Sequence, residues 1–400
     1  MANKFYIILI AQFLSALADN ALLFAAIAML ASFSAPLWHT PLLQQFFVIS
    51  YILLAPFVGP IADSFPKGSV MFFSNLVKVI GCLAMILGMH PLFAYGIVGI
   101  GAAAYSPAKY GIMSELLPSE QLVEANGWME GSTVIAIILG TILGGFASER
   151  LDAAMWLIGG LYLAGSMFNY FIPKLPIDHK LEQKSLKYIL KDFTHAFFAL
   201  WKDPLGQLSL AVTTLFWGAG ATLKFVVITW AMLALDFTFK ESSYLIATVG
   251  FGIAIGAFFA SKYITLEKSV KVLPAGIIMG VLVIAMIFTT HWVVAGFILL
   301  LIGALSGFFV VPLNALLQHR GHHLIGPGHS IAVQNFNEHI GILIMLGIYL
   351  LMVRENIHID TITIAFGAFI IISMSIINRV YRNIQISDQY NRTIQLNSTD

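Results

Sequence analysis

Charged residues and cysteines are both scarce in this sequence. Only 10% of the 400 residues are Asp, Glu, Lys or Arg, whereas soluble domains contain about 25%. The single cysteine, Cys82, excludes a disulfide within the chain and suggests no zinc site. The formal net charge of +1 argues against nucleic acid as a partner, because nucleic acid requires a concentrated basic surface.

The motifs of common enzyme classes are also missing. The sequence contains no phosphate-binding P-loop, no HExxH metal motif and no nucleophile elbow, so neither ATP-driven transport nor hydrolysis is supported. An integral-membrane acyltransferase or lipase would need a Ser–His or His–Asp set at one membrane interface, and we identify none. We therefore expect a protein that is not an enzyme and that uses no cofactor.

Apolar residues dominate instead. They make up 59% of the chain, and the mean hydropathy is +0.87, so lipid must serve as the solvent for much of the surface. The first apolar stretch, 5–33, is far longer than the core of a signal peptide. A spanning helix needs about 20 mainly apolar residues. Twelve segments qualify: 5–33, 42–62, 69–89, 91–113, 128–147, 153–172, 206–235, 242–261, 270–290, 292–318, 330–353 and 359–380.

Lysine and arginine are distributed unequally between the two sides of such a chain. Of the 21, fifteen fall on the side of the termini and three on the opposite side. Because cytoplasmic loops carry an excess of Lys and Arg, we expect both termini to be cytoplasmic. The fifteen are Lys4, Lys67, Lys174, Lys180, Lys184, Lys187, Lys191, Lys202, Lys262, Lys268, Lys271, Arg320, Arg379, Arg382 and Arg392, and the three are Arg150, Lys240 and Arg354.

The longest loop divides the chain near its middle. Within 173–205, apolar residues recur at helical spacing with Lys184, Lys187 and Lys191 between them. This pattern predicts an amphipathic helix. Two interpretations fit: a helix lying on the anionic inner leaflet, which we favour, or a linker whose apolar face packs on the bundle.

The two halves on either side of this loop repeat each other weakly. Ser106–Lys109 in the fourth segment corresponds to Val311–Asn314 in the tenth, and Glu130 in the fifth corresponds to Glu338 in the eleventh. Parallel repeats of six helices are typical of rocker-type transporters. The sequence predicts an all-α membrane protein with twelve transmembrane helices in two six-helix pseudo-symmetric halves, 1–172 and 206–381, followed by a cytoplasmic tail, 382–400.

The loop after the second segment resembles that of the major facilitator superfamily, which usually carries G-x-x-x-D-R-x-G-R-R. This sequence keeps Gly59 and Asp63 at that spacing but has Ser64 in place of the arginine, and Lys67 is the one basic residue that remains. The resemblance implies a major facilitator fold in which Gly59, Asp63 and Lys67 take part in gating. The fifth segment carries glycines similar to that family's helix-5 motif: Gly131, Gly140, Gly144 and Gly145.

Longer runs resemble the bacterial lysophospholipid transporter family within that superfamily. The resemblance covers all twelve predicted helices. It implies transport of lysophospholipid, notably lysophosphatidylethanolamine, from the outer to the inner leaflet of a Gram-negative inner membrane by alternating access. It also implies functional coupling to an acyltransferase/acyl-carrier-protein synthetase that reacylates the product. The runs are 11–16, 19–24, 101–111, 216–220, 307–318 and 332–335.

Ionisable residues inside the predicted helices are the candidate substrate site. Each costs at least about 2.5–3.5 kcal/mol at mid-bilayer, so each needs a partner or a wet cavity. In the fold that the resemblance implies, the first, fourth, seventh and tenth helices line a central cavity, with the fifth and eleventh beside them. The residues that fall there are Asp19, Lys109, Glu130, Lys224, Asn314 and Glu338.

Asp19 and Lys224 lie near mid-helix at nearly matching positions of the two halves. They either pair with each other across the cavity or each hold one pole of a zwitterion. A lysine suits a phosphate as a point charge, and a carboxylate suits an ammonium group through a charge-assisted hydrogen bond. A purely structural salt bridge is the alternative.

Other charges have simpler explanations beside the functional one. Lys109 lies near a helix end, from which it can snorkel, and a carboxylate such as Glu130 near a helix start is favoured by the helix dipole. Lys78 lies on a helix that is usually peripheral in this fold, where snorkelling or pairing with a neighbouring helix fits better than substrate contact. His319–His323 reads as a solvated loop rather than a metal site, because no carboxylate or cysteine completes a ligand set. A proton-coupled exporter of drugs or other amphiphiles, with Asp19 and Glu338 as proton carriers, is the second functional hypothesis.

Overall fold

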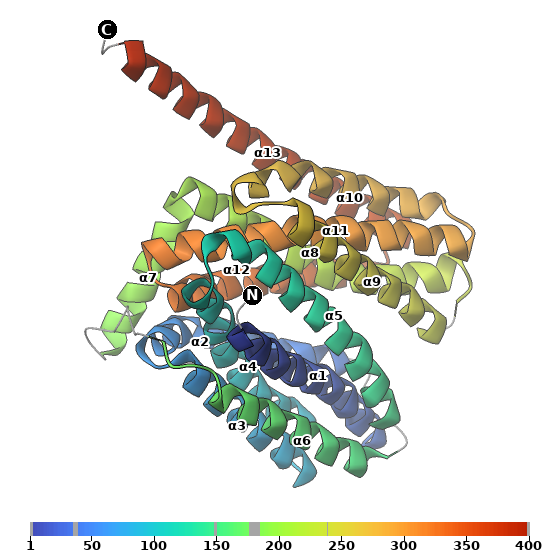
Figure 1. The fold of residues 1–400 in the computed structure, drawn as a ribbon. Coiled ribbons are helices and arrows are strands. Elements are labelled where there is room, and N and C mark those ends of the chain that lie inside the picture. The colour runs from blue at the N-terminus through green and yellow to red at the C-terminus, as the bar shows by residue number, and fades with distance from the viewer. Residues whose placement is uncertain (1–2, 35–38, 148–149, 176–184, 238, 398–400) are drawn as a thin grey trace.

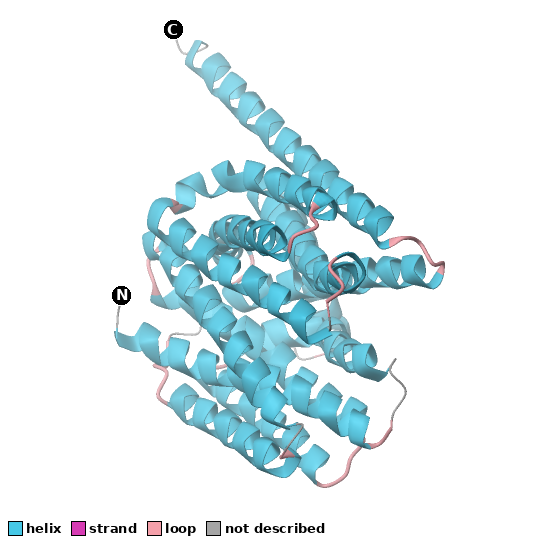
Figure 2. Cartoon of the chain, turned by 90° about the vertical axis from the view of Figure 1, so that its right-hand side faces the viewer, coloured by secondary structure: helices cyan, strands magenta, loops and turns pink. Residues whose placement is uncertain are grey.

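The computed structural model describes residues 3–34, 39–147, 150–175, 185–237 and 239–397. Every regular element in these residues is a helix, and short loops connect them (Figure 2). The hydrocarbon layer offers the backbone no water to bond with, so helices, which satisfy their own backbone N–H and C=O groups, are the expected solution in lipid.

Six long helices precede the central linker and six follow it. The first six are α1 (Asn3–Ser32), α2 (His39–Ser64), α3 (Lys67–Ile86), α4 (Pro91–Leu116), α5 (Leu122–Ala147) and α6 (Leu151–Tyr170). The last six are α8 (Pro204–Ala234), α9 (Phe239–Tyr263), α10 (Leu273–Ala285), α11 (Trp292–Leu324), α12 (Pro327–Arg354) and α13 (Ile359–Asn397). Short 3₁₀ turns, η1 (Ser119–Gln121), η2 (Leu266–Val272) and η3 (Met286–Phe288), precede α5 and flank α10, and α7 (Leu186–Lys202) lies in the linker.

Eleven helical segments among the described residues are long and apolar enough to cross a membrane. The remaining long helix is α4, which is rich in glycine, alanine and tyrosine and is mostly buried among its neighbours. A helix enclosed by other helices contacts little lipid, so close packing favours small residues over large apolar ones. The twelve predicted segments therefore all fall on helices, and α4 completes the set.

Local sequence explains where several of these helices begin. His90 and His291 each accept a backbone N–H at the start of α4 and α11, at 3.3 Å in both cases. Asp203 accepts the N–H of Gly206 at 2.8 Å and so caps α8, an arrangement that satisfies a free donor of the first turn. Gly326 has φ +96°, which lets the chain reverse tightly between α11 and α12.

Two helix ends differ from the sequence prediction. The expected loop His319–His323 lies in the last turns of α11, which continues to Leu324, so those histidines are helical residues. Among the described residues no group of three or more metal-ligand side chains forms there. The last helix, α13, continues to Asn397, through most of the segment expected as a tail.

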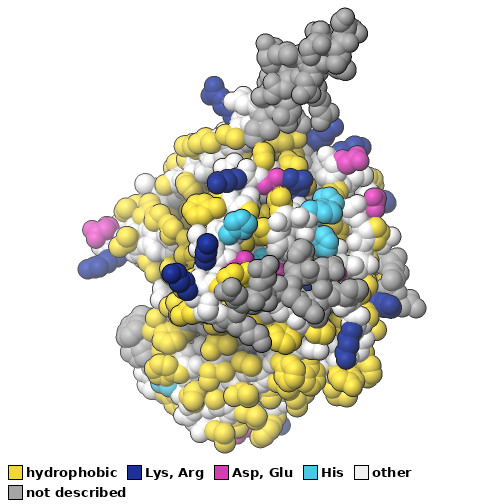
Figure 3. All heavy atoms as spheres, turned by 90° about the vertical axis from the view of Figure 1, so that its left-hand side faces the viewer, with side chains coloured by type: hydrophobic (Ala, Val, Ile, Leu, Met, Phe, Trp, Pro, Cys, Tyr) yellow, Lys and Arg dark blue, Asp and Glu magenta, His cyan; other side chains and the backbone are white. Residues whose placement is uncertain are grey.

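The helices form two groups that lie side by side (Figure 1). Two apolar clusters lie within α1–α6. A third contains the core of α8–α13 and extends to residues of α1, α4 and α5. The end of the bundle at which α1 begins and across which α7 lies is called the terminal face here. Lysine and arginine side chains are spread over this face, between hydrophobic surfaces (Figure 3).

The amphipathic helix predicted in the linker is α7. It lies crosswise to α12 on the terminal face (Figure 1), and Ser185 caps its start by accepting the N–H of Tyr188. Phe193, Ala196 and Leu200 are buried against α2, α8, α11 and α12. The apolar side of α7 therefore packs on the bundle, as the second interpretation of the sequence had it. Residues 176–184 of the linker, including Lys184, lie outside the described part of the chain.

Small residues bring α9 and α11 into direct backbone contact. A Cβ at Gly256 on α9 would lie 1.9 Å from the carbonyl oxygen of Ala304, and one at Gly303 on α11 would lie 2.1 Å from that of Val249. Neither position has room for a side chain. In lipid such close approach is a main source of helix association, because apolar burial alone gives little preference for protein over lipid.

We expect Gly256→Leu to destabilise the protein, because the added side chain must push α9 away from α11. Overpacking of this kind costs about 1–3 kcal/mol. The midpoint of thermal unfolding in detergent measures it. Gly160→Leu on α6 is the matched control, since nothing lies within 4 Å of a Cβ there. Equal melting temperatures for the two variants would contradict the assigned packing.

Candidate functional site

The carboxylate of Asp19, in the middle of α1, is held by two other helices of the first half. Lys78 on α3 donates to Asp19 Oδ2 at 2.8 Å, and the hydroxyl of Tyr162 on α6 donates to Oδ1 at 2.8 Å. The Asp19 side chain is 24% exposed, whereas that of Lys78 is 1% exposed. A carboxylate has four acceptor positions, so Asp19 keeps room for a further donor on its accessible side.

Lys78 is the most enclosed charge of this group. Its ammonium also donates to Ser15 Oγ at 2.9 Å and lies 4.9 Å from the ring centre of Tyr105. A buried ammonium needs all of this, because its desolvation is otherwise uncompensated. The structure therefore pairs Asp19 with Lys78, and not with Lys224 across the two halves. Pairing of Lys78 with a neighbouring helix agrees with the sequence analysis.

Lys224 lies near the middle of α8 with its side chain accessible. Among the residues that the structure describes, it forms no ion pair or hydrogen bond. An accessible ammonium without a protein partner at this depth has to be hydrated or bound to a ligand. Lys224 is therefore the strongest candidate in the second half for binding an anionic group of a ligand.

Lys109 and Glu130 both contact one tyrosine. The Lys109 ammonium is 4.1 Å from the ring centre of Tyr110 on α4, and the Tyr110 hydroxyl donates to Glu130 Oε1 on α5 at 3.5 Å. Glu130 is buried, while Lys109 is half-buried. The ring of Tyr110 therefore satisfies part of the ammonium, and its hydroxyl satisfies part of the carboxylate.

Asn314 and Glu338 are joined through a third polar residue in the second half. Gln334 on α12 donates to Glu338 Oε1 at 2.7 Å and to Asn314 Oδ1 on α11 at 2.9 Å. One helical turn links Gln334 to Glu338, so both side chains lie on the same face of α12. Beside them the His339 ring stacks on Tyr51 of α2, with 4.0 Å between the ring centres.

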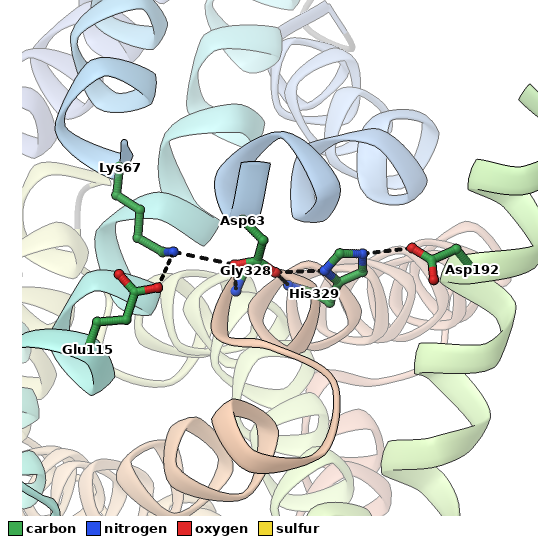
Figure 4. Close-up of polar contacts among 6 residues, drawn as sticks. All are labelled: Asp63, Lys67, Glu115, Asp192, Gly328 and His329. Carbon is green, nitrogen blue, oxygen red and sulfur yellow. Dashed lines mark hydrogen bonds and ion pairs between the residues drawn. The ribbon is translucent and has the colours of Figure 1, made fainter. Parts of the chain in front are cut away.

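Asp63 joins the two halves at the terminal face (Figure 4). Its carboxylate accepts the backbone N–H of Gly328 at 2.7 Å and that of His329 at 2.9 Å, both at the start of α12. The His329 ring contacts Asp63 Oδ2 through Nδ1 at 2.6 Å and Asp192 of α7 through Nε2 at 2.9 Å. The hydrogen bond from His329 holds the pKa of Asp192 below its usual range. We call these residues (Asp63, Gly328, His329 and Asp192) the latch.

The other two gating candidates lie next to the latch. Lys67 donates to Asp63 Oδ1 at 3.4 Å and to Glu115 on α4 at 2.5 Å, so it ties the end of α2 to α4. Gly59 lies against α12, where a Cβ would be 3.0 Å from His329 Cα. The structure thus brings Gly59, Asp63 and Lys67 together, as the motif predicts.

Two uncharged contacts close the same face. The side-chain amides of Asn126 on α5 and Gln318 on α11 exchange two hydrogen bonds of 2.9 Å each, and both are buried. Asn335 on α12 donates to Ser106 on α4 at 2.9 Å. Within the described residues, every hydrogen bond between the halves lies between mid-membrane and the terminal face. The protein is therefore held closed at that face.

The charged residues of the site were predictable from the sequence, but their partners were not. Lys78 was assigned to a peripheral helix, and neither Asp192 nor His329 was connected with Asp63. A signal for the latch was present, since Asp192 lies at the helical position that faces the same way as buried Phe193 and Ala196. No local signal joins residues 137 positions apart, such as Asp192 and His329.

Solved structures of transporters share this fold. The human organic anion transporter MFSD10 superposes with a TM-score of 0.77 at 14% identity, covering 94% of this chain and all of that one. A bacterial homologue of the iron transporter ferroportin gives 0.76 at 16% identity, covering 96% and 99%. Residues 8–346 match the family model of the Major Facilitator Superfamily. The chain therefore has the fold of this superfamily.

Closer relatives narrow the class. The chain is 45% identical over 367 residues to the lysophospholipid transporter LplT of Enterobacter sp. (strain 638), covering 91% of this chain and 92% of the relative. It is also 45% identical over 374 residues to that of Escherichia coli (strain SMS-3-5), covering 92% and 93%. The chain belongs to the LplT family of the Major Facilitator Superfamily, whose members are transporters and not enzymes.

We expect Asp63→Asn to open the terminal face. An asparagine retains one acceptor, but its amide donor then meets the backbone donors of Gly328 and His329. Loss of about 1–3 kcal/mol changes the ratio of closed to open molecules roughly 5- to 150-fold. Spin labels at Glu120→Cys and Lys268→Cys, in a Cys82→Ser background, report the distance between the halves on this face.

Asp360→Asn serves as the control for this measurement. It removes the same charge from an exposed His358–Asp360 contact, at the start of α13 on the opposite face. The distance distribution should lengthen for Asp63→Asn and stay unchanged for Asp360→Asn. Identical distributions in the parent and in Asp63→Asn would show that the latch does not hold the closed state.

Proposed function

We propose that this chain carries lysophospholipids, lysophosphatidylethanolamine among them, from the outer to the inner leaflet of a bacterial inner membrane. The strongest support is the identity of 45% over more than nine-tenths of the chain to lysophospholipid transporters. Residues 1–172 and 206–381 would be the two bodies that rock against each other around the bound lipid.

The charges inside the bundle suit a zwitterionic head group. Lys224 offers an unpaired ammonium to the phosphate. Asp19 offers its accessible carboxylate positions to the amine. Four further residues complete the proposed site: Lys109, Glu130, Asn314 and Glu338. Each is held in place by a neighbouring side chain, so we assign them to polar contacts around the head group.

The acyl chain has different requirements. Each CH2 group gains about 0.8 kcal/mol from an apolar environment, so the chain should remain in lipid or in an apolar groove while the head group crosses. Large apolar side chains cover much of the outer surface of the bundle. A transporter for such a substrate has to enclose only the polar end.

The terminal face is proposed to be cytoplasmic, with both termini on that side. The excess of Lys and Arg in segments on this side supports it, and basic side chains are spread over the terminal face (Figure 3). With the latch formed, a head group would then be admitted from the outer leaflet and held until the latch opens. Reacylation on the cytoplasmic side by an acyltransferase/acyl-carrier-protein synthetase would consume the product.

We expect Lys224→Met to weaken lysophosphatidylethanolamine uptake into proteoliposomes at least tenfold without loss of thermal stability. A hydrogen bond to a charged group contributes about 1.5–3 kcal/mol, and no protein partner is stranded by its removal. Lys271→Met, an exposed lysine of η2, is the control. Normal uptake by Lys224→Met would remove the proposed phosphate ligand.

Asp19 needs a paired variant in the same assay, because Asp19→Asn also strands buried Lys78. Breaking one partner of a buried pair destabilises by about 3–5 kcal/mol. In Asp19→Asn/Lys78→Met neither charge remains, so stability should recover while uptake stays lost. Recovery of uptake together with stability would assign Asp19 to a structural salt bridge, which is the alternative weighed from the sequence.

The remaining alternative is a proton-coupled exporter. Measuring uptake in the presence of an uncoupler distinguishes it from this proposal. Removal of product by reacylation pulls an alternating-access cycle forward, so uptake needs no proton carrier, and Asp19 and Glu338 act as fixed ligands. We expect uptake in spheroplasts to continue when the proton gradient is dissipated and acyl transfer is intact. Collapse of uptake under those conditions would favour proton coupling through one of these carboxylates.

A further inference from the structure

The ring of His339 on α12 has one nitrogen with a protein partner and one without. Nδ1 lies 2.7 Å from the backbone carbonyl oxygen of Asn335, one helical turn earlier. A carbonyl oxygen only accepts hydrogen bonds, so Nδ1 carries the hydrogen. Nε2 forms no hydrogen bond or ion pair with the residues that the structure describes, and it is accessible rather than enclosed by protein.

The second nitrogen, Nε2, is a hydrogen-bond acceptor. No carboxylate of the described residues pairs with the His339 ring, and burial disfavours the charged form of a histidine, so the ring is neutral. In a neutral imidazole, the nitrogen without the hydrogen offers a lone pair. The ring is stacked on that of Tyr51, with 4.0 Å between the ring centres and 10° between the planes. This stacking fixes the direction in which the lone pair points.

The stack of His339 on Tyr51 borders the proposed head-group site. The charges of Asp19 and Glu338 both act on Tyr51, so the stack lies near these two carboxylates. Along α12, His339 lies farther from the terminal face than His329 of the latch. A head group that enters from the opposite face therefore meets His339 before it meets the latch.

An acceptor at this position needs a donor from the substrate. Lysophosphatidylethanolamine has two kinds of donor, its ammonium group and the free hydroxyl of its glycerol. A carboxylate such as that of Asp19 is the stronger partner for the ammonium, because both groups are charged. The phosphate has no hydrogen to donate. The glycerol hydroxyl is the donor that remains, and a diacyl phospholipid lacks it.

We propose that His339 Nε2 accepts a hydrogen bond from the free glycerol hydroxyl of a lysophospholipid. The inference rests on the transport function proposed above and adds a specificity-determining contact to the same site. A diacyl lipid brings an ester oxygen to this position, so two acceptors face each other and the nitrogen stays unpaired. A site that bonds a substrate hydroxyl discriminates against an analogue without it for this reason.

Two substrates that differ only in this hydroxyl test the contact. Uptake into proteoliposomes is measured for 1-acyl lysophosphatidylethanolamine and for its 2-deoxy analogue, each well below half-saturation, so that the rates compare kcat/KM. We expect the parent to prefer the substrate with the hydroxyl roughly 2- to 10-fold, the factor that one net hydrogen bond provides. In His339→Phe, which keeps a ring to stack on Tyr51 but has no acceptor, this preference should disappear. Both substrates meet the same protein, so the ratio does not depend on how much of the variant folds.

Tyr51→Phe is the matched control. It removes a hydroxyl from the other ring of the stack and leaves Nε2 in place, so the preference should be retained. Equal uptake of the two substrates by the parent would overturn the proposal, and so would a preference that survives in His339→Phe. Equal loss of the preference in both variants would assign it to the polarity of the stack and not to Nε2. Failure of the parent to take up either substrate would instead refute the transport function, and the inference with it.

Discussion

A charge placed in hydrocarbon must be compensated, and most of the interior of this protein follows from that requirement. Asp19 and Lys78 compensate each other, so an ion pair links α1 to α3, with Tyr162 of α6 as a third contact. Glu338 is satisfied by Gln334, which also fixes α11 through Asn314. Lys224 is the exception, because it has no such partner among the described residues. In a transporter, the charge that the protein leaves uncompensated is the one available to the substrate.

The same requirement operates differently at the terminal face. The side chain of Asp63 is 1% exposed, yet its partners include Gly328 and His329 of the opposite half as well as Lys67 of its own half. Asp192 of the linker joins this group through His329. Because the latch and the Asn126–Gln318 pair are formed between bodies that must separate, each opening exposes these groups to water, which can replace the lost hydrogen bonds. Contacts that water can replace on opening suit a gate, whereas the Asp19–Lys78 pair lies within one half and need not break when the halves separate.

A structural feature could be predicted from the sequence where neighbouring residues encode it, and not where it depends on contacts between distant residues. Hydropathy located all twelve long helices, because lipid contact is a property of about 20 consecutive residues. The spacing of Gly59 and Asp63 predicted a gating role, which stays a prediction, and the structure places both residues against the start of α12. The partner of Asp19 was not predictable, because the direction in which Lys78 points depends on how α3 rotates against α1. The histidines at the end of α11 were misassigned to a loop, since a helix that projects beyond the bilayer has no apolar signal to mark its end.

One helix connects the proposed substrate site to the gate. Within a single stretch of α12, His329 joins the latch, Asn335 bonds to Ser106, Glu338 belongs to the polar group at mid-membrane, and His339 stacks on Tyr51. A helix is stiff over this length, so α12 cannot leave Asp63 while it remains stacked on Tyr51 without bending. The contacts between α12 and the first half therefore form or break together, and a head group that perturbs Glu338 acts on the same rigid element as the latch. Two discrete arrangements of such an element, and not a gradual deformation, are what alternating access requires.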